Sequence, residues 1–301
     1  MKNSENKGGN EAIASLPPST ELAIELKNIT KRFGHVVANS DVNLKVSTGT
    51  IHGIVGENGA GKSTLMNILF GLYKPDSGMI FLNGQAVDVN SPEKSIALGI
   101  GMVHQQFMLV PTFTVLENAM LGNEGSMFLQ SGEELVLDRL KGLSENYGLD
   151  VDFEAIISDT PVGMQQRVEI LKALNRGAKI LILDEPTGVL TPQETIGLFD
   201  ILRSLREQGV TIILITHKLK EIMSITDTVS VMRGGRVVAD FSTEKTSPEE
   251  LAENMVGRKV LLSIKKPTLK VGKPVLEVKN VSQESKDGVL VLKNISFDLK
   301  E

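Results

Sequence analysis

Alternating apolar and polar residues predict strands in the first part of this chain. The segments "AIELKNI" (23–29) and "VNLKV" (42–46) alternate in the way typical of half-buried strands. "TIHGIV" (50–55) is a more continuous apolar strand that runs directly into a glycine-rich loop. After that loop, apolar residues recur at helical spacing at Leu65, Met66, Ile68 and Leu69. The loop is therefore predicted to join a strand to a helix.

Further along, the pattern alternates between strands and helices. "GMIFLNGQAVD" (78–88) predicts a hairpin that turns at Asn83 and Gly84, and residues from about 115 to 176 are predicted to be mostly helical. "KILILDEPT" (179–187) and "VTIILITH" (210–217) contain apolar runs typical of buried parallel strands. This order predicts an α/β fold with a mostly parallel sheet, an antiparallel part and a helical insertion.

The segment "TPQE" (191–194) predicts the start of a helix that ends near Gly209. Thr191 is suited to be the N-cap, proline fits the first helical position, and the glutamate completes a capping box. The residues expected to face inward on this helix are Ile196, Phe199, Leu202 and Leu205.

Composition and an internal repeat suggest the domain organisation. Residues 1–20 are polar and are predicted to be a disordered tail. "LEVKNVS" at 276–282 echoes "IELKNIT" at 24–30, and "VLKNISFDLK" at 291–300 echoes "VVANSDVNLK" at 36–45. We therefore expect one domain over 21–260, a linker over 261–274, and the start of a second, truncated copy over 275–301, as in the front half of a tandem protein. Chance resemblance between amphipathic strands is the alternative.

Composition limits the possible functions. Hydrophobic residues make up 41% and charged residues 23% of the 301 residues, which is ordinary for a globular protein. The net charge of -5 argues against broad binding to nucleic acid, and none is expected as a partner. The absence of cysteine excludes disulfides and thiolate chemistry. No apolar run approaches the roughly 20 residues of a membrane span, and the first residues lack a signal-peptide pattern, so we expect the protein to stay in the cytoplasm.

The glycine-rich loop has the pattern G-x-x-x-x-G-K-[ST], in which backbone N–H groups surround phosphates at a helix N-terminus. A flexible glycine turn is the alternative. Lys62 is expected to bring positive charge to the outer phosphates, and the Ser63 hydroxyl to bind Mg²⁺. The predicted phosphate-binding residues are Gly56, Glu57, Asn58, Gly59, Ala60, Gly61, Lys62, Ser63 and Thr64.

Two adjacent carboxylates follow the predicted buried strand at 180–184. Asp184 is expected to reach Mg²⁺ directly or through water. Glu185 is suited to orient and deprotonate an attacking water, so we assign it as the general base. Acidic residues at strand ends also serve simply as solubilising caps, but the phosphate loop favours the catalytic interpretation.

Together these motifs resemble those of ABC-type ATPases, which are P-loop NTPases that use ATP and Mg²⁺. The resemblance spans about residues 21–260 and depends on "GENGAGKST", "VHQQFMLVPTFTVLEN", "PVGMQQRVEILKAL", "LDEPT" and "LITHKLKEI", in the order of the family. It implies a helical subdomain at about 104–176. It also implies that Gln105 contacts Mg²⁺ and the attacking water, that His217 contacts the terminal phosphate, and that Phe33 stacks on adenine. A surface glutamine, a core histidine and a core phenylalanine are the alternatives.

The same resemblance implies a head-to-tail pair of ATPase domains. The signature residues Val162, Gly163, Met164 and Gln165 would then contact the nucleotide of the partner, which is a second domain of the same full-length chain or another copy. This sequence has Pro161 where a serine is usual, and Thr191 where an aspartate is usual. We therefore expect an asymmetric pair, although Thr191 can also be explained as a helix cap.

Within that family the chain resembles the ATPase subunits of bacterial importers for simple sugars and nucleosides. The resemblance implies hydrolysis of ATP to ADP and phosphate at the cytoplasmic face of the membrane, with transmembrane permease subunits and, indirectly, an extracytoplasmic solute-binding protein as partners. Two alternatives remain: a soluble tandem ATPase acting on ribosomes or DNA, and a regulatory nucleotide-binding module without hydrolysis.

Overall fold

A computed structural model describes residues 21–121, 129–259, 272–285 and 288–301. The chain divides into two compact units, with the boundary after residue 260, and each is described by itself. The tail predicted at 1–20 and residues 261–271 of the predicted linker lie outside the described residues. No helix among the described residues is both long enough and apolar enough to cross a bilayer.

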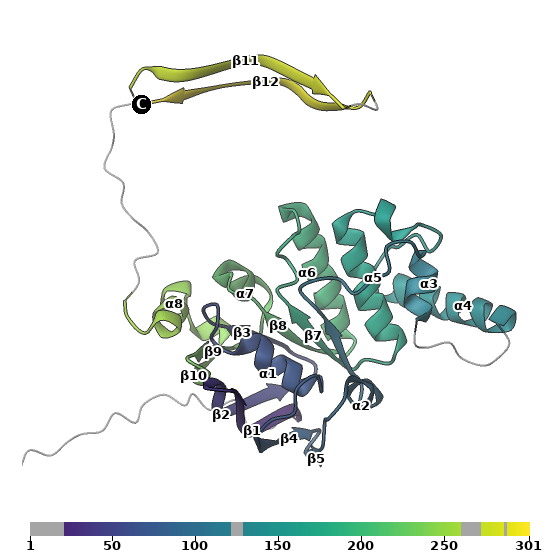
Figure 1. The fold of residues 1–301 in the computed structure, drawn as a ribbon, viewed down its shortest axis with the longest axis vertical. Coiled ribbons are helices and arrows are strands. Elements are labelled where there is room, and N and C mark those ends of the chain that lie inside the picture. The colour runs from purple at the N-terminus through teal and green to yellow at the C-terminus, as the bar shows by residue number, and fades with distance from the viewer. Residues whose placement is uncertain (1–20, 122–128, 260–271, 286–287) are drawn as a thin grey trace, which may run out of the picture. The chain divides into compact units, whose positions relative to one another are not determined.

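A mixed six-stranded sheet forms the centre of the first unit (Figure 1). Its order is β10 (Arg236–Ser242), β9 (Thr228–Arg233), β3 (Ile51–Val55), β8 (Thr211–Ile215), β7 (Ile180–Asp184) and β6 (Ile100–Val103). Only β10 runs antiparallel to its neighbour. Every residue of β3, β6, β7 and β8 is buried, which explains why these strands read as apolar runs rather than alternating patterns.

A separate antiparallel sheet has the order β2, β1, β4, β5. Its strands are β1 (Leu22–Phe33), β2 (Val36–Ser47), β4 (Ser77–Leu82) and β5 (Gln85–Val87). The predicted hairpin is confirmed, because β4 and β5 pair on either side of Asn83 and Gly84. Both turn residues have positive φ, 48° and 77°, as a two-residue hairpin turn requires.

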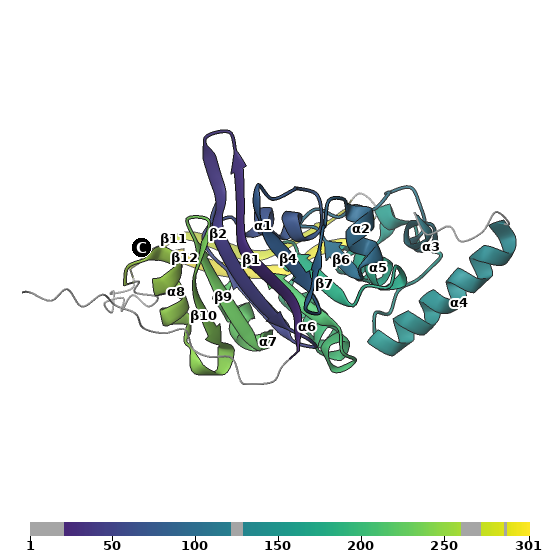
Figure 2. The same cartoon turned by 90° about the horizontal axis from the view of Figure 1, so that it is seen from below.

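Helices cover the sheets and form the insertion. They are α1 (Lys62–Leu69), α2 (Pro92–Ala97), α3 (Val115–Met120), α4 (Leu129–Tyr147), α5 (Val162–Asn175), α6 (Pro192–Glu207), α7 (Leu219–Ile225) and α8 (Pro248–Val256), with two short 3-10 turns at Ile157–Asp159 and Thr243–Lys245. Helices α3, α4 and α5 gather at one end of the unit, as Figure 2 also shows. The predicted α/β class, with a mostly parallel sheet, an antiparallel part and a helical insertion, is confirmed.

Helix α6 begins with the predicted capping box, in which Thr191 accepts from the Glu194 N–H and the Glu194 carboxylate accepts from the Thr191 N–H. One inward position was predicted wrongly, because Ile196 is 63% exposed. The buried face includes Leu198 and Ile201 as well as the other predicted residues. Ile196 lies beyond the edge of this face, so nothing packed on α6 covers it.

The second unit is a hairpin of β11 (Pro274–Glu284) and β12 (Leu290–Lys300). Its register matches that of β1 and β2: Ile24 pairs with Val46 as Leu276 pairs with Leu299, and Leu26 pairs with Leu44 as Val278 pairs with Phe297. The echo of 24–30 at 276–282 agrees with this register. The second echo was placed two residues too late, because the pairing makes 289–298, not 291–300, correspond to 36–45. The irregularities also match. Asn28 and Asp41 have positive φ in the first hairpin, and Asn280 and Asn294 have positive φ in the second.

Candidate functional site

The glycine-rich loop connects β3 to α1 and leaves little room for side chains. An added Cβ would lie 2.4 Å from the Met232 carbonyl oxygen at Gly56, and 2.3 Å from the Ala38 carbonyl oxygen at Gly61. The Asn39 amide donates to the Gly61 carbonyl at 3.1 Å, so strand β2 fixes the end of the loop. Glycine is required here because backbone from two other strands closes around the loop.

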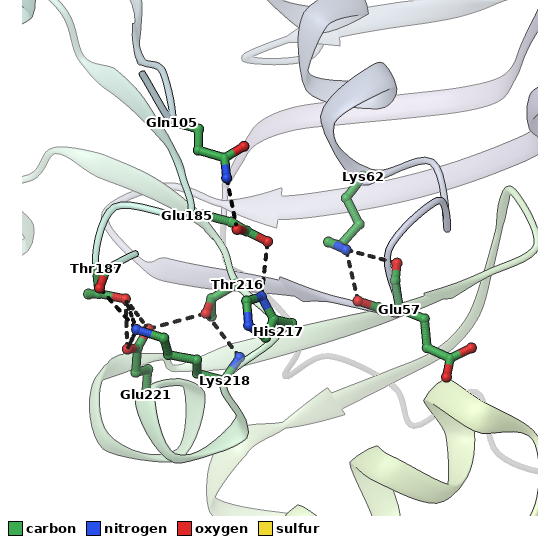
Figure 3. A network of polar contacts seen from close by, with 10 residues as sticks. Glu57, Lys62, Gln105, Glu185, Thr187, Thr216, His217, Lys218 and Glu221 are labelled. Carbon is green, nitrogen blue, oxygen red and sulfur yellow. Dashed lines mark hydrogen bonds and ion pairs between the residues drawn. The ribbon is translucent and has the colours of Figure 1, made fainter. Parts of the chain in front are cut away.

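Lys62 crosses the loop from the start of α1 (Figure 3). Its Nζ donates to the carbonyl oxygens of Gly56 at 2.8 Å and Glu57 at 3.0 Å. Burial lowers the pKa of Lys62, and the carboxylates of Glu185 and Asp184 oppose this shift. Helix α1, whose residues are all described, has no side-chain cap and no acidic residue in its first turn. Its first N–H groups are therefore suited to bind an anion.

Asp184 ends β7 beside the start of α1. Burial raises its pKa, and a hydrogen bond from the Ser63 hydroxyl acts in the opposite direction. Its buried Oδ1 has no hydrogen-bond partner among the residues that the structure describes. Among the described residues, no group of three or more acidic or histidine side chains is arranged to hold a metal ion by itself. The Ser63 hydroxyl and the Asp184 carboxylate fit Mg²⁺, which typically binds one or two carboxylates together with phosphate oxygens and water.

Glu185 brings together two of the predicted site residues (Figure 3). Gln105 Nε2 donates to Glu185 Oε2 at 3.3 Å, and His217 Nδ1 lies 3.0 Å from Glu185 Oε1. Glu185 also has a positive φ of 47°, an uncommon conformation for a side chain of this kind. Strained backbone of this type occurs preferentially at functional sites. The three residues predicted to act in catalysis thus form one hydrogen-bonded group.

The sequence interpretation missed a buried polar group behind Glu185 and His217. It consists of Thr187, Thr216 and Glu221, and the half-exposed Lys218 pairs with it from the side of the solvent. The only signal in the sequence is that the two threonines flank the motifs containing Glu185 and His217, with Glu221 four residues after the histidine.

Phe33 ends β1, next to the turn into β2. It is 43% exposed, and its ring meets Tyr73 edge-on at 5.2 Å between centroids. Because β2 contacts the phosphate loop through Asn39, the hairpin carrying Phe33 is anchored beside the loop. Its predicted stacking on adenine stays a prediction.

The signature residues 162–165 begin helix α5, which Figure 1 shows apart from α1. Val162 and Gln165 line a groove together with Gln105 and Val189. An added Cβ on Gly163 would lie 2.7 Å from Oε1 of Glu194, so the capping box of α6 packs closely against this helix start. The structure therefore does not bring these residues to the loop of the same chain, and their contact with a partner's nucleotide stays a prediction.

Pro161 and Thr191, which stand where a serine and an aspartate are usual, each precede the first turn of a helix. Pro161 is the N-cap of α5 and supplies no side-chain hydrogen bond. Thr191 is the N-cap of α6, and its hydroxyl bonds the Glu194 carboxylate at 2.8 Å.

Comparison with known proteins identifies the family. Residues 39–188 match the ABC transporter family. A nucleoside import ATP-binding protein, NupA of Lactococcus lactis, is 47% identical over 94% of this chain and 56% of its own length. The guanosine import ATP-binding protein NupO of Bacillus subtilis is 48% identical over 93% of this chain and 55% of its own length. The glucose import ATP-binding protein TsgD13 of Haloferax volcanii is 44% identical over 93% of this chain and 56% of its own length. The chain spans about half the length of the curated relatives it matches.

Solved structures show the same fold. A nucleotide-free ATP-binding cassette from an ABC transporter matches with a TM-score of 0.69 at 25% identity, over 78% of this chain and 95% of that one. A dimeric bacterial ABC transporter cassette matches with a TM-score of 0.62 at 29% identity, over 73% of this chain and 98% of that one. With the loop around Lys62 and the strand end at Asp184, these matches establish that the chain belongs to the ABC transporter family of ATP-binding proteins.

Proposed function

We propose that this chain is the ATP-hydrolysing subunit of a membrane importer. The observation that carries the proposal is the convergence of Gln105 and His217 on the two carboxylate oxygens of Glu185, beside the loop that contains Lys62. Glu185 is suited to be the general base, because a carboxylate held between two side chains can orient an attacking water and accept its proton.

ATP would bind with its phosphates against the N–H groups of the loop and the first turn of α1. Lys62 would exchange its two carbonyl partners for phosphate oxygens, which are stronger partners because they are charged. Mg²⁺ would be held by Ser63 and Asp184, with Gln105 nearby. Bound there, it would neutralise charge on the terminal phosphates.

A second ATPase domain is proposed as the partner of this one. The matched registers of the two hairpins support the proposal that residues 275–301 begin a second cassette. Equivalent hydrogen bonds support it too: the Asn28 N–H donates to Asn43 Oδ1, and the Asn280 N–H donates to Ser296 Oγ. In a head-to-tail pair, residues 162–165 would contact the nucleotide bound by the other domain.

The proposed cargo is a nucleoside or simple sugar, because the relatives named above are import proteins for nucleosides, guanosine and glucose. The proposed partners are transmembrane permease subunits, with an extracytoplasmic solute-binding protein acting through them. The chain would then lie at the cytoplasmic face of the membrane as a peripheral subunit.

Binding of ATP with Mg²⁺ to wild type and Lys62→Ala tests the nucleotide site. We expect at least a hundredfold loss of affinity in Lys62→Ala, with an unchanged circular dichroism spectrum. Lys220→Ala is the matched control, because Lys220 is exposed on α7. Equal affinity of Lys62→Ala and wild type would overturn the site.

Turnover tests the coupling to transport. ATP hydrolysis by the complete protein should rise strongly when the permease subunits are added, and cells that contain them should take up labelled nucleosides or sugars. Stimulation by ribosomes or DNA in place of permease subunits would instead favour a soluble mechanical ATPase.

A further inference from the structure

A buried polar cluster joins the two loops that carry Glu185 and His217. We call Thr187, Thr216 and Glu221 the threonine clamp. Thr187 lies two residues after Glu185, and Thr216 lies immediately before His217. Both threonines are 1% exposed and Glu221 is 9% exposed, so water does not compete for their hydrogen bonds.

Both threonine hydroxyls donate to the same carboxylate (Figure 3). Thr187 Oγ1 lies 2.7 and 2.8 Å from the two oxygens of Glu221, and Thr216 Oγ1 lies 3.2 Å from Oε2. A hydrogen bond to an ionised partner is about twice as strong as a neutral one. Glu221 therefore fixes the distance between the loop that carries Thr187 and the loop that carries Thr216.

Lys218 completes the charge balance of the clamp. Its Nζ lies 3.1 Å from Glu221 Oε1 and donates to the Thr187 carbonyl oxygen at 2.9 Å. Its own N–H donates to Thr216 Oγ1 at 3.0 Å. The buried carboxylate thus has a counter-ion and several donors, which is the condition under which burying a charge is tolerated.

The clamp is built on a fixed element. Glu221 lies on α7, and its neighbour Ile222 is fully buried in a cluster with Val229 and Leu251. Helix α7 therefore cannot move without disturbing the packing against β9 and α8. A side chain held by such an element positions groups more precisely than a loop residue does.

We propose that the threonine clamp sets the position of Glu185 relative to His217, and that Glu221 is a positioning residue for ATP hydrolysis. The inference rests on the proposed function. No clamp atom needs to contact nucleotide: the clamp acts through the main chain between Thr187 and Glu185, and between Thr216 and His217. Its loss should therefore lower turnover while leaving nucleotide binding by the loop unchanged.

Variants of the two threonines separate the hydroxyl from the packing. Thr187→Val and Thr216→Val remove the hydroxyl but keep the branched shape, whereas Thr187→Ser and Thr216→Ser keep the hydroxyl. In the complete protein with its permease subunits, we expect the Val variants to lower kcat at least tenfold with KM within twofold of wild type. The Ser variants should stay within threefold of wild type. The double Val variant should be no slower than the slower single one, because the clamp acts as a unit.

Hydrogen exchange provides a readout that does not depend on turnover. Peptides covering 184–190 and 214–219 should exchange faster in the Val variants than in the Ser variants or wild type. If a Val variant does not fold, Glu221→Gln is measured instead, and kcat should fall with KM retained.

The outcomes separate the two proposals. If both Val variants keep the wild-type kcat and the wild-type rate of hydrogen exchange, the clamp is overturned. It is also overturned if the Ser variants are as slow as the Val variants, because the loss of turnover would then come from altered packing and not from the missing hydroxyl. If wild type binds ATP but does not hydrolyse it, the proposed function fails and the exchange comparison alone decides the clamp.

Discussion

His217 Nδ1 lies 3.0 Å from Glu185 Oε1, although 32 residues separate the two along the chain. Strands β7 and β8 are parallel neighbours, so the loops that follow them leave the same edge of the sheet. The Glu185 N–H also donates to the Ile215 carbonyl oxygen at 2.9 Å, which ties the two loops together at their origin. The contact between these side chains is therefore a consequence of strand order.

The role of Glu185 can be tested by Glu185→Gln. The amide keeps the size of the side chain but cannot accept the proton of water, so hydrolysis should fall at least a hundredfold, within the range typical of general bases. ATP affinity should be unchanged. Steady-state turnover and equilibrium binding measure the two effects, with the exposed Glu207→Gln on α6 as the control. Turnover of Glu185→Gln at the wild-type rate would mean that another group is the base.

Three glycines should differ in the cost of an added methyl group. Gly61→Ala combines a φ of +98° with a clash against the Ala38 carbonyl oxygen, whereas Gly59 has a φ of +83° and open space. Gly59→Ala should cost about 1–3 kcal/mol of unfolding free energy from backbone strain, and Gly61→Ala should cost more. Gly142, in α4, has neither constraint, so Gly142→Ala should stabilise by up to about 1 kcal/mol. Urea unfolding measures the order, and equal costs at Gly59 and Gly61 would contradict it.

His52 should make the protein sensitive to acid. Its ring is 3% exposed and bonds the hydroxyls of Thr228 and Ser230, and burial lowers the pKa of His52 to about 4 from 6.5. The unfolded chain therefore binds more protons between these values, so stability is fully present above pH 6.5 and is lost as the pH falls toward 4. The loss should reach about 3 kcal/mol.

Urea unfolding of wild type and His52→Gln at several pH values isolates this contribution. Asp240, which accepts from Ser230, has a pKa raised by burial and so acts in the opposite direction. Because His52 and Asp240 share Ser230, both proteins are compared in an Asp240→Asn background, which removes this opposing titration. An equal acid dependence of wild type and His52→Gln would contradict the prediction.

Thr191 can be compared with a second capping box. Thr191→Ala and Thr114→Ala each remove the N-cap of a box with the same pattern, so each should cost about 1 kcal/mol of unfolding free energy. If Thr191 is only a cap, both variants should also keep wild-type turnover below their unfolding temperatures. Slower turnover in Thr191→Ala alone would reveal a further contact made by this residue.

Pro161 tests the proposed asymmetry of the paired domains. Pro161→Ser supplies an N-cap hydroxyl to α5 and, in a head-to-tail pair, a donor to the partner's nucleotide. Turnover of the complete protein should rise in Pro161→Ser but not in Pro161→Ala, which lacks the hydroxyl. Unchanged turnover in both would count against an asymmetric pair.

The sequence by itself determined the local features of this protein. The glycine loop, the apolar strands β3, β7 and β8 and the capping box at Thr191 were all predicted correctly. Each of these features depends on backbone geometry or on hydrophobic periodicity within a few residues. The residues that determine such a feature are therefore the same residues that form it. The fold class follows from the order of these elements.

Only the tertiary structure decided which residues meet. Gln105 and Glu185 are 80 residues apart, and their contact depends on the pairing of β6 with β7. The threonine clamp was missed because two ordinary threonines and one helical glutamate acquire a shared role only when burial removes their access to water. Ile196 was predicted wrongly because periodicity gives the direction of a side chain, whereas only the packing of neighbouring elements decides whether anything covers it.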